Sequence, residues 1–399
     1  MKANYHIILP FISAVLSIGD VNAQANLPPV EIRPANTSYK PAFEGQTRIT
    51  GVKTSAAYEG KILSTELKSP WGIAKLPDGR FLITEKRGNM RIATIEGKLS
   101  DPITGIPVVN PAGQGGLLGL AIDPDFKKNR MVYWSFSEPG TEGNLTAIAK
   151  GKLAEDEKTI QDVKVIYRAT PAFASALHYG GRIVIDKTGN LIISTGERSS
   201  LKTRPQAQQL NSSLGKVIRI TKDGQAAPGN PTIGGTEKPE LYSYGHRNVQ
   251  GMAIDSASGE LWEHEFGPRG GDELNLIKPG RNYGWPIITY GIEYGGKPVG
   301  DSIQQKENME QPVYYWDPVV SPSGMTFYYG NNIPEWKSNL FISCLSGEFV
   351  LRLIIKNNKV VGEERLLVQE KQRFRDITVG ADGALYTVTD QGRLYRIGK

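Results

Sequence analysis

Apolar and polar residues alternate along this chain in a pattern that returns six times. In each copy a short apolar segment meets a polar turn, and a second apolar segment rich in β-branched or aromatic residues follows. Alternation with a period of two is typical of β-strands, so each copy predicts an antiparallel hairpin. The copies are WGIAKLPDGRFLIT at 71–84, LLGLAIDPDF from 117 with MVYWS from 131, GRIVIDKTGNLIIS at 181–194, QGMAIDSASGELWE at 250–263, GMTFYY from 324 with NLFIS ending at 343, and RDITVGADGALYTV at 375–388.

Several hairpins are followed by a third segment with a basic or polar edge, at 215–221, 350–355 and 392–398. Repeated antiparallel meanders predict an all-β fold, and six of them predict a six-bladed β-propeller with four-stranded antiparallel blades. A stack of β-sandwiches is the alternative. Residues 58–67 precede the first hairpin, and we expect them to add a strand that closes the ring beside the C-terminal blade.

The N-terminus has the pattern of a secretory signal peptide. Lys2 precedes an apolar run over 7–18, and small residues around Ala23 predict cleavage after that residue. The run is too short, and too interrupted by Pro10 and Ser13, to span a membrane. We therefore expect a signal peptide over 1–23, an extended proline-containing arm over 24–57, a propeller over 58–399 and a periplasmic location.

Composition removes several classes of function. The net charge of +6 is spread along the 399 residues without a basic stripe, which argues against nucleic-acid binding. Cys344 is the only cysteine, so the chain has no intrachain disulfide and no Cys-x-x-Cys-His haem site. Electrons from any redox reaction must therefore pass to an external electron acceptor. The sequence leaves a monomer and a homodimer equally open.

Topology brings polar residues from several copies to one place. In a meander, the start of the first strand and the end of the second lie at the same edge of the sheet. We therefore expect one central mouth at the end of the propeller axis. The residues that enter or leave hairpins there are Gln114, His178, Arg247, Arg373, Glu197, Gly267, Pro268, Leu345 and Ser346.

His178 is the predicted general base. It enters the mouth within the segment ALHYGGR, and Glu197 leaves the partner strand nineteen residues later. Imidazole is a suitable base near neutral pH, and a carboxylate on the far ring nitrogen would fix its tautomer. A buried structural histidine is the alternative. For His246 and His264 the structural role is favoured, because neither has a spaced partner in the sequence.

The stretch from Tyr244 to Pro286 combines a fixed cation, adjacent carboxylates and flexible backbone. Arg247, Asp272 and Glu273 stand there among glycines, a set that can hold an anionic ligand and a hard metal ion together. A solvated, turn-rich loop is the alternative. The glycines of GQGGLLG at 113–119 have the wrong spacing for a dinucleotide site, and the chain lacks both a Gly-x-Ser-x-Gly elbow and a spaced zinc set.

A family resemblance rests on motifs that keep their order and approximate spacing from Tyr58 to the C-terminus. They are GQGGLLGLAIDPDF, HYGGRI with STGE, YGHRNVQGMA, FGPRGGDELN and NYGWP. In these motifs the chain resembles the soluble PQQ-dependent sugar dehydrogenases, specifically the aldose sugar dehydrogenase branch of the glucose/sorbosone dehydrogenase family. The fold of that family is a six-bladed propeller, in agreement with the repeat count.

The resemblance implies oxidation of aldose sugars at C1 to the lactone, with PQQ and Ca²⁺ as cofactors. By similarity, His178 takes the proton of the C1 hydroxyl while hydride passes to C5 of the PQQ quinone, and Glu197 orients the histidine. Arg247 polarises the reacting carbonyl. The implied PQQ contacts are His178, Arg247, Asn248, Gln114, Tyr294, Arg373, Arg375 and the segment Cys344, Leu345 and Ser346. The implied calcium ligands are the carbonyls of Gly267 and Pro268, and for a second ion Glu273 and the Tyr283 carbonyl.

The sequence departs from the family pattern at two places. Several relatives carry a lysine that pairs with a PQQ carboxylate where this chain has Ser346, so one charge contact is lost. Phe266 makes one wall of the expected pocket more apolar, and we assign Tyr315 and Trp316 to core packing rather than to stacking on the cofactor. Two other functions stay open: a lactonase-type propeller hydrolase and a non-catalytic carbohydrate-binding propeller.

Overall fold

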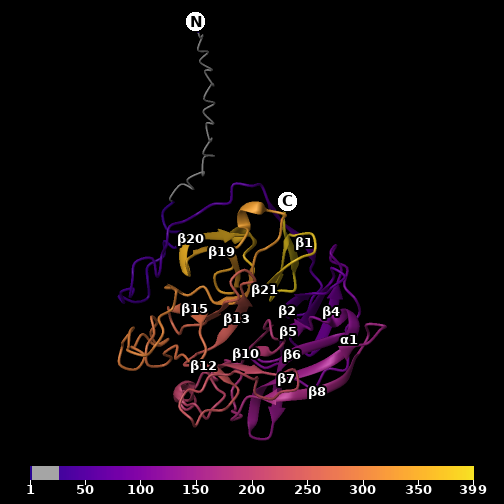
Figure 1. The fold of residues 1–399 in the computed structure, drawn as a ribbon, viewed down its shortest axis with the longest axis horizontal. Helices are drawn as coiled ribbons and strands as arrows, with labels where there is room; N and C mark the ends of the chain where they lie inside the picture. Colours follow the sequence, from indigo (N-terminus) through magenta and orange to yellow (C-terminus); the bar gives the residue numbers. More distant parts are fainter. Residues whose placement is uncertain (2–26) are drawn as a thin grey trace.

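Six antiparallel sheets stand in a ring around a central axis (Figure 1). In this computed structural model the described residues are Met1 and 27–399, so the predicted signal peptide lies outside them except for Met1. The all-β six-bladed propeller expected from the sequence is confirmed. Each predicted hairpin forms the two inner strands of one blade, because its first apolar segment lines the axis and its second packs beside it.

The blades follow one another along the chain, and we number them in that order. Blade 1 contains β2 (Pro70–Lys75), β3 (Phe81–Glu85) and β4 (Asn89–Ala93); blade 2 contains β5 (Leu117–Ile122), β6 (Met131–Gly140), β7 (Gly143–Leu153) and β8 (Ile160–Arg168). Blade 3 contains β9 (Gly180–Ile185), β10 (Leu191–Thr195), β11 (Lys216–Ile220) and β12 (Leu241–Tyr244); blade 4 contains β13 (Val249–Ile254), β14 (Leu261–Glu265), β15 (Asp272–Ile277) and β16 (Tyr314–Trp316). Blade 5 contains β17 (Pro322–Phe327), β18 (Leu340–Cys344), β19 (Val350–Lys356) and β20 (Lys359–Leu366); blade 6 contains β21 (Phe374–Val379), β22 (Leu385–Thr389), β23 (Leu394–Gly398) and β1 (Glu59–Ser64).

The ring is closed by strands from both ends of the chain. β1 pairs antiparallel with β23, with Glu59 opposite Gly398 and Ile62 opposite Tyr395, which confirms the predicted closing strand. Blade 1 differs from the four-stranded expectation. Its sheet has three strands, and only the isolated bridges of Met90 with Ile103 and of Ala93 with Leu99 continue its outer edge.

Hydrophobic side chains fill the wedges between neighbouring blades. One cluster joins Leu82 and Met90 of blade 1 to Leu117 and Trp134 of blade 2, and others join the later pairs in the same way. The helices are short: α1 (Phe126–Asn129), η1 (Arg204–Gln208), η2 (Pro334–Trp336) and η3 (Val368–Glu370). Across the described part of the chain, no helix has the length and apolarity that crossing a membrane requires.

The innermost strands pack closely at one level of the axis. Glycines occupy this level in blades 1, 2, 4 and 5, at Gly72, Gly119, Gly251 and Gly324. A Cβ on Gly251 would lie 2.3 Å from the Ser323 carbonyl oxygen of the next blade, so a larger residue does not fit. Blades 3 and 6 place Arg182 and Asp376 at this level, and the two side chains form a buried ion pair of 2.8 Å.

Residues 27–57 run as an extended strap over blades 4 and 5. The Asp317 carboxylate accepts hydrogen bonds from the backbone N–H groups of Asn36 (2.8 Å) and Thr37 (3.0 Å). Further along, Arg365 pairs with Glu31 at 2.8 Å, and the Val52 N–H donates to the Glu363 carbonyl at 2.9 Å. The strap is thus fixed to the propeller by charge and backbone contacts rather than by a sheet of its own.

Candidate active site

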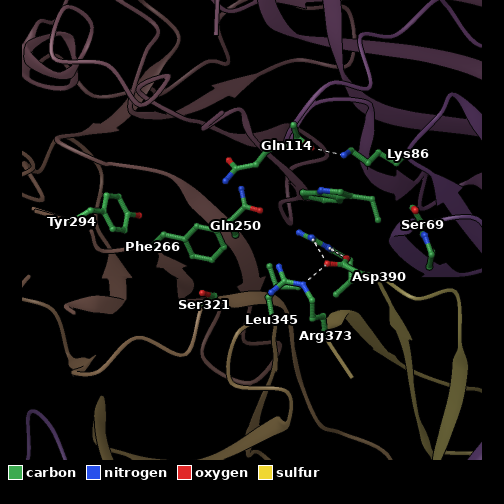
Figure 2. A pocket seen from close by; sticks show the side chains of 14 residues that line it. Ser69, Lys86, Gln114, Gln250, Phe266, Tyr294, Ser321, Leu345, Arg373 and Asp390 are labelled. Atoms are coloured by element: carbon green, nitrogen blue, oxygen red, sulfur yellow. Dashed lines mark hydrogen bonds and ion pairs between the residues drawn. The ribbon is translucent and has the colours of Figure 1, made fainter. Parts of the chain in front are cut away.

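A cavity of about 430 Å³ opens at the predicted mouth. It is lined by residues of blades 1, 2, 4, 5 and 6, several of which stand where a strand begins or ends (Figure 2). Among the predicted site residues, Gln114, Tyr294, Leu345, Arg373 and Arg375 line this cavity. Phe266 also lines it, as the apolar wall expected from the sequence.

The blade 6 side of the cavity is basic. Arg373 donates through Nε to Asp390 at 3.0 Å, and Arg375 donates through Nε to the other oxygen of the same carboxylate at 2.7 Å. Burial alone would raise the pKa of Asp390, but the charges and hydrogen bonds of Arg375 and Arg373 lower it overall. Two guanidinium groups therefore share one carboxylate, and a net positive charge remains for an anionic ligand.

His178 lies directly behind the Gln114 wall of the cavity. Its backbone N–H donates to the Gln114 side-chain oxygen at 2.8 Å, and its Nδ1 lies 2.5 Å from Glu197 Oε1. Because an ionised carboxylate only accepts, Nδ1 carries the proton and Nε2 is the free basic nitrogen. Burial and the nearby charge of Arg247 lower the pKa of His178 to about 4, so the imidazole is neutral at pH 7.

Arg247 and Asn248 sit between this pair and blade 4. The Arg247 guanidinium donates to the carbonyls of Phe266 (3.1 Å) and Gly267 (2.8 Å), and its backbone N–H donates to the Glu265 carboxylate. Its Nε and the Asn248 Nδ2 are buried polar atoms without a partner. Buried polar groups are ordinarily paired, so these donors are available to a ligand that enters here.

The predicted calcium carbonyls and carboxylate belong to one neighbourhood. Gly267, Glu273 and Tyr283 line a small second cavity together with Glu265 and Arg247. Its volume of about 10 Å³ suits a single ion or water molecule. The Gly267 carbonyl already accepts from Arg247, so a cation on this oxygen would displace or share that contact.

A second imidazole–carboxylate pair lies beside this cavity, contrary to the expectation that His246 has no partner. The Nδ1 atom of His246 lies 3.2 Å from Glu265 and 3.7 Å from Glu263. Its Nε2 atom lies 2.8 Å from the Ser243 hydroxyl, and its ring stacks on Tyr283. Burial and then the charge of Glu265 raise the pKa of Glu263 well above its ordinary value. His264 is buried, and burial lowers its pKa to about 3, as for a structural histidine.

Five of the predicted cofactor contacts are not among the residues that line the mouth cavity: His178, Arg247, Asn248, Cys344 and Ser346. Cys344 is buried in the core of blade 5, and the Ser346 hydroxyl points to the Ser321 hydroxyl at 2.6 Å. Tyr315 stacks on Tyr290 and Trp316 packs against Tyr314, so both belong to the core as expected.

The residues of the cavity wall that sequence reasoning missed include Trp71, Lys86, Gln250 and Asp390. The strand-entry and strand-exit rule, applied to the first and last copies, would have found three of them. Trp71 enters blade 1, Lys86 leaves its second strand, and Asp390 leaves the second strand of blade 6. The guanidinium carbon of Arg182 lies 4.5 Å from the centre of the Trp71 ring, and that of Arg375 lies 6.0 Å from it.

The fold and this site define a six-bladed propeller with a basic, polar-walled cavity at one end of its axis. The chain belongs to the glucose/sorbosone dehydrogenase family, whose family model matches residues 67–396. It is 39% identical to the aldose sugar dehydrogenase YliI of Escherichia coli over 343 residues, which cover 84% of this chain and 92% of that protein.

Solved structures agree with this assignment. The E. coli soluble aldose sugar dehydrogenase in its apo form is 38% identical, with a TM-score of 0.81 over 86% of this chain and 99% of that one. The PQQ-bound aldose sugar dehydrogenase of Streptomyces coelicolor is 30% identical, with a TM-score of 0.72 over 87% and 99%. The resemblance drawn from the motifs is therefore confirmed at the level of the family.

Proposed function

We propose that this protein oxidises aldose sugars at C1 to the lactone, with PQQ and calcium as cofactors. The observation that carries the proposal is the His178–Glu197 pair, held through Gln114 against a cavity whose opposite wall presents Arg373 and Arg375. A base next to a cationic cavity is the arrangement that dehydrogenation on an anionic quinone requires. The PQQ-bound relative supports the identity of that quinone.

The residues of the cavity fit PQQ in size and charge. A volume of about 430 Å³ lies in the usual range for small-molecule sites, and PQQ is a tricarboxylate. Arg373 and Arg375 would hold its carboxylates, and the unpartnered Nε of Arg247 and Nδ2 of Asn248 would receive its polar edge. When bound, PQQ supplies the acceptor for the hydride that leaves the sugar.

The chain itself supplies the proton chemistry and the orientation. His178 takes the hydroxyl proton on Nε2, because Glu197 holds the Nδ1 proton. Glu197 then stabilises the imidazolium, and its position is fixed by its own backbone N–H, which donates to the Arg247 carbonyl at 2.9 Å. Arg247 places positive charge where negative charge develops during the reaction.

Calcium fits the small blade 4 cavity. Glu265 and Glu273 line it, and Glu263 lies beside them. Arg247 and His246 are basic groups next to these carboxylates. Oxygen ligands of this kind suit Ca²⁺. Glu273 and the Tyr283 carbonyl would hold one ion, and the carbonyls of Gly267 and Pro268 would hold an ion next to the mouth.

From the predicted signal peptide we infer a periplasmic location, where an external acceptor would take up the electrons of the reaction. Purified apo-protein is expected to reduce an artificial acceptor dye with aldoses only after addition of PQQ and Ca²⁺. If the protein binds neither cofactor and reduces no dye, a carbohydrate-binding propeller is favoured and the proposal is wrong.

The sharper test is the His178→Ala variant. Loss of a general base costs about 10²–10⁴ in rate, so we expect kcat for dye reduction to fall by that factor while PQQ still binds. PQQ affinity, measured by absorbance titration of the same preparation, is the control for folding. Turnover near the wild-type value would remove His178 from the mechanism.

A further inference from the structure

Lys86 is the one cavity-lining cation that the proposed function leaves without a role. It follows β3 directly, at the exit edge of blade 1, and its Nζ donates to the Gly113 carbonyl. In Figure 2 its side chain extends toward Gln114, while Arg373 and Asp390 lie on another side of the cavity. Lys86 therefore presents a positive charge to the cavity from a blade that supplies no other cation to its wall.

The glycine run GQGG explains how Lys86 is held there. Leu117 donates its backbone N–H to the Lys86 carbonyl at 2.9 Å. Gly116 has a φ of +129°, and a Cβ at this position would lie 2.2 Å from the same carbonyl oxygen. The run that resembles a dinucleotide motif thus serves to bring the blade 2 backbone against Lys86. Two contacts, one through the backbone and one through Nζ, fix the residue at the cavity edge.

On the cavity wall itself, the residues other than Lys86 carry less positive charge than PQQ carries negative charge. Arg373 and Arg375 share Asp390, so this group contributes a net charge of about +1 against the three carboxylates of PQQ. Blade 5 does not add to it, because the Ser346 hydroxyl is paired with Ser321. Burial and then the charge of Arg375 lower the pKa of Lys86, and a bound carboxylate would offset both effects.

We propose that Lys86 is a cofactor-binding residue that pairs with a carboxylate of PQQ and takes over the charge contact that Ser346 does not provide. This inference rests on the proposed function, since it presumes that PQQ occupies the mouth cavity. It assigns to blade 1 a part of cofactor binding that the sequence motifs place only on blades 2 to 6.

The test is a PQQ titration of apo-protein at fixed Ca²⁺, followed by tryptophan fluorescence, for which Trp71 in the cavity wall is a local reporter. Lys86→Met removes the charge and the Gly113 contact, whereas Lys86→Gln removes the charge and keeps a donor for that carbonyl. We expect both variants to weaken the Kd for PQQ by roughly tenfold, the size of one charged contact. Lys359→Met, at an exposed position in the outer hairpin of blade 5, is the matched control and should bind as the wild type does.

A rescue variant makes the test specific. Ser346→Lys in the Lys86→Gln background should recover most of the lost affinity, because it returns a cation to the cavity from blade 5. Wild-type Kd values for both Lys86 variants would overturn the inference, as would a rescue variant no tighter than Lys86→Gln alone. If the wild-type apo-protein does not bind PQQ at all, the proposed function itself fails, and this result is distinct from a Lys86 effect.

Discussion

At the scale of single residues, His178 is a buried imidazole whose surroundings disfavour its charged form. Burial and the Arg247 charge lower its pKa to about 4, and the hydrogen bond and charge of Glu197 offset this only in part. The folded pKa lies below the unfolded value of about 6.5, so the unfolded chain binds more protons between these limits. Stability contributed by neutral His178 is therefore present above pH 6.5 and is lost as the pH falls toward 4.

Urea unfolding at pH 7 and pH 5 measures this effect. From pH 7 to pH 5, the free energy of unfolding of the wild type should fall by about 2 kcal/mol more than that of His178→Gln, because glutamine does not titrate. The comparison cancels the contribution of His264, which is present in both proteins. Equal pH dependence in the two proteins would show that His178 titrates near its ordinary pKa.

At the scale of the structural element, carboxylates at the end of the second strand form a repeated contact. Glu85 accepts from the Lys68 backbone N–H at 2.7 Å, Glu197 pairs with His178, Glu265 with His246 and Asp390 with Arg375. Each carboxylate binds the segment that enters its own blade. The His178–Glu197 pair is thus one of four such contacts in this propeller, and it differs from the others in its place behind the Gln114 wall of the cavity.

The position of these carboxylates in each blade follows from the sequence, but their partners follow from it only in part. Alternating residues and polar turns were sufficient for the hairpins, their order and the convergence of Gln114, Leu345 and Arg373, because these follow from the β period and from meander topology. The equivalence of His246 with His178 was missed, although both precede a glutamate by nineteen residues. The contact of Arg247 with the Gly267 carbonyl could not be predicted, because the choice of acceptor depends on side-chain packing in three dimensions.

The acidic group of blade 4 leads to a prediction about metal removal. Burial and then the charge of Glu265 raise the pKa values of Glu263 and Glu273. A raised carboxyl pKa contributes stability below about pH 4.5 that is lost as the pH rises through the folded value. Without a cation, ionisation of these groups therefore costs stability near neutral pH, and bound Ca²⁺ removes this cost.

We expect Ca²⁺ at about a hundredfold excess over its Kd to raise Tm by roughly 3–5 °C relative to EDTA, with a larger difference at pH 8 than at pH 5. Differential scanning calorimetry at both pH values measures it. Glu273→Gln should reduce the calcium-dependent shift, whereas the exposed Glu155→Gln should leave it unchanged. A Tm that does not respond to Ca²⁺ at pH 8 would contradict a cation site in this cavity.

At the scale of the whole molecule, one ion pair joins blades on opposite sides of the ring. Asp376 of blade 6 accepts from Arg182 of blade 3 and from the Ile73 N–H of blade 1, both through Oδ2. Arg182 also donates through Nε to the Gln250 carbonyl of blade 4 at 3.0 Å, and Gly324 of blade 5 packs against Asp376. The pair therefore contacts three other blades on the inner ring, at Ile73, Gln250 and Gly324, and lies next to Trp71 of the cavity wall.

Removing one partner of this pair should be much more costly than removing both. Asp376→Ala leaves the Arg182 guanidinium buried without its carboxylate, which typically costs about 3–5 kcal/mol, and the urea midpoint should fall accordingly. The double variant Asp376→Ala with Arg182→Met removes the uncompensated charge, so its midpoint should lie closer to the wild type. Asp382→Ala breaks a partly exposed ion pair with Arg396 in the same blade and should cost at most about 1 kcal/mol. If Asp376→Ala lowers the free energy of unfolding no more than Asp382→Ala does, the Arg182–Asp376 pair does not hold the blades together. The position of Trp71 must then be fixed by the close packing of the inner glycines.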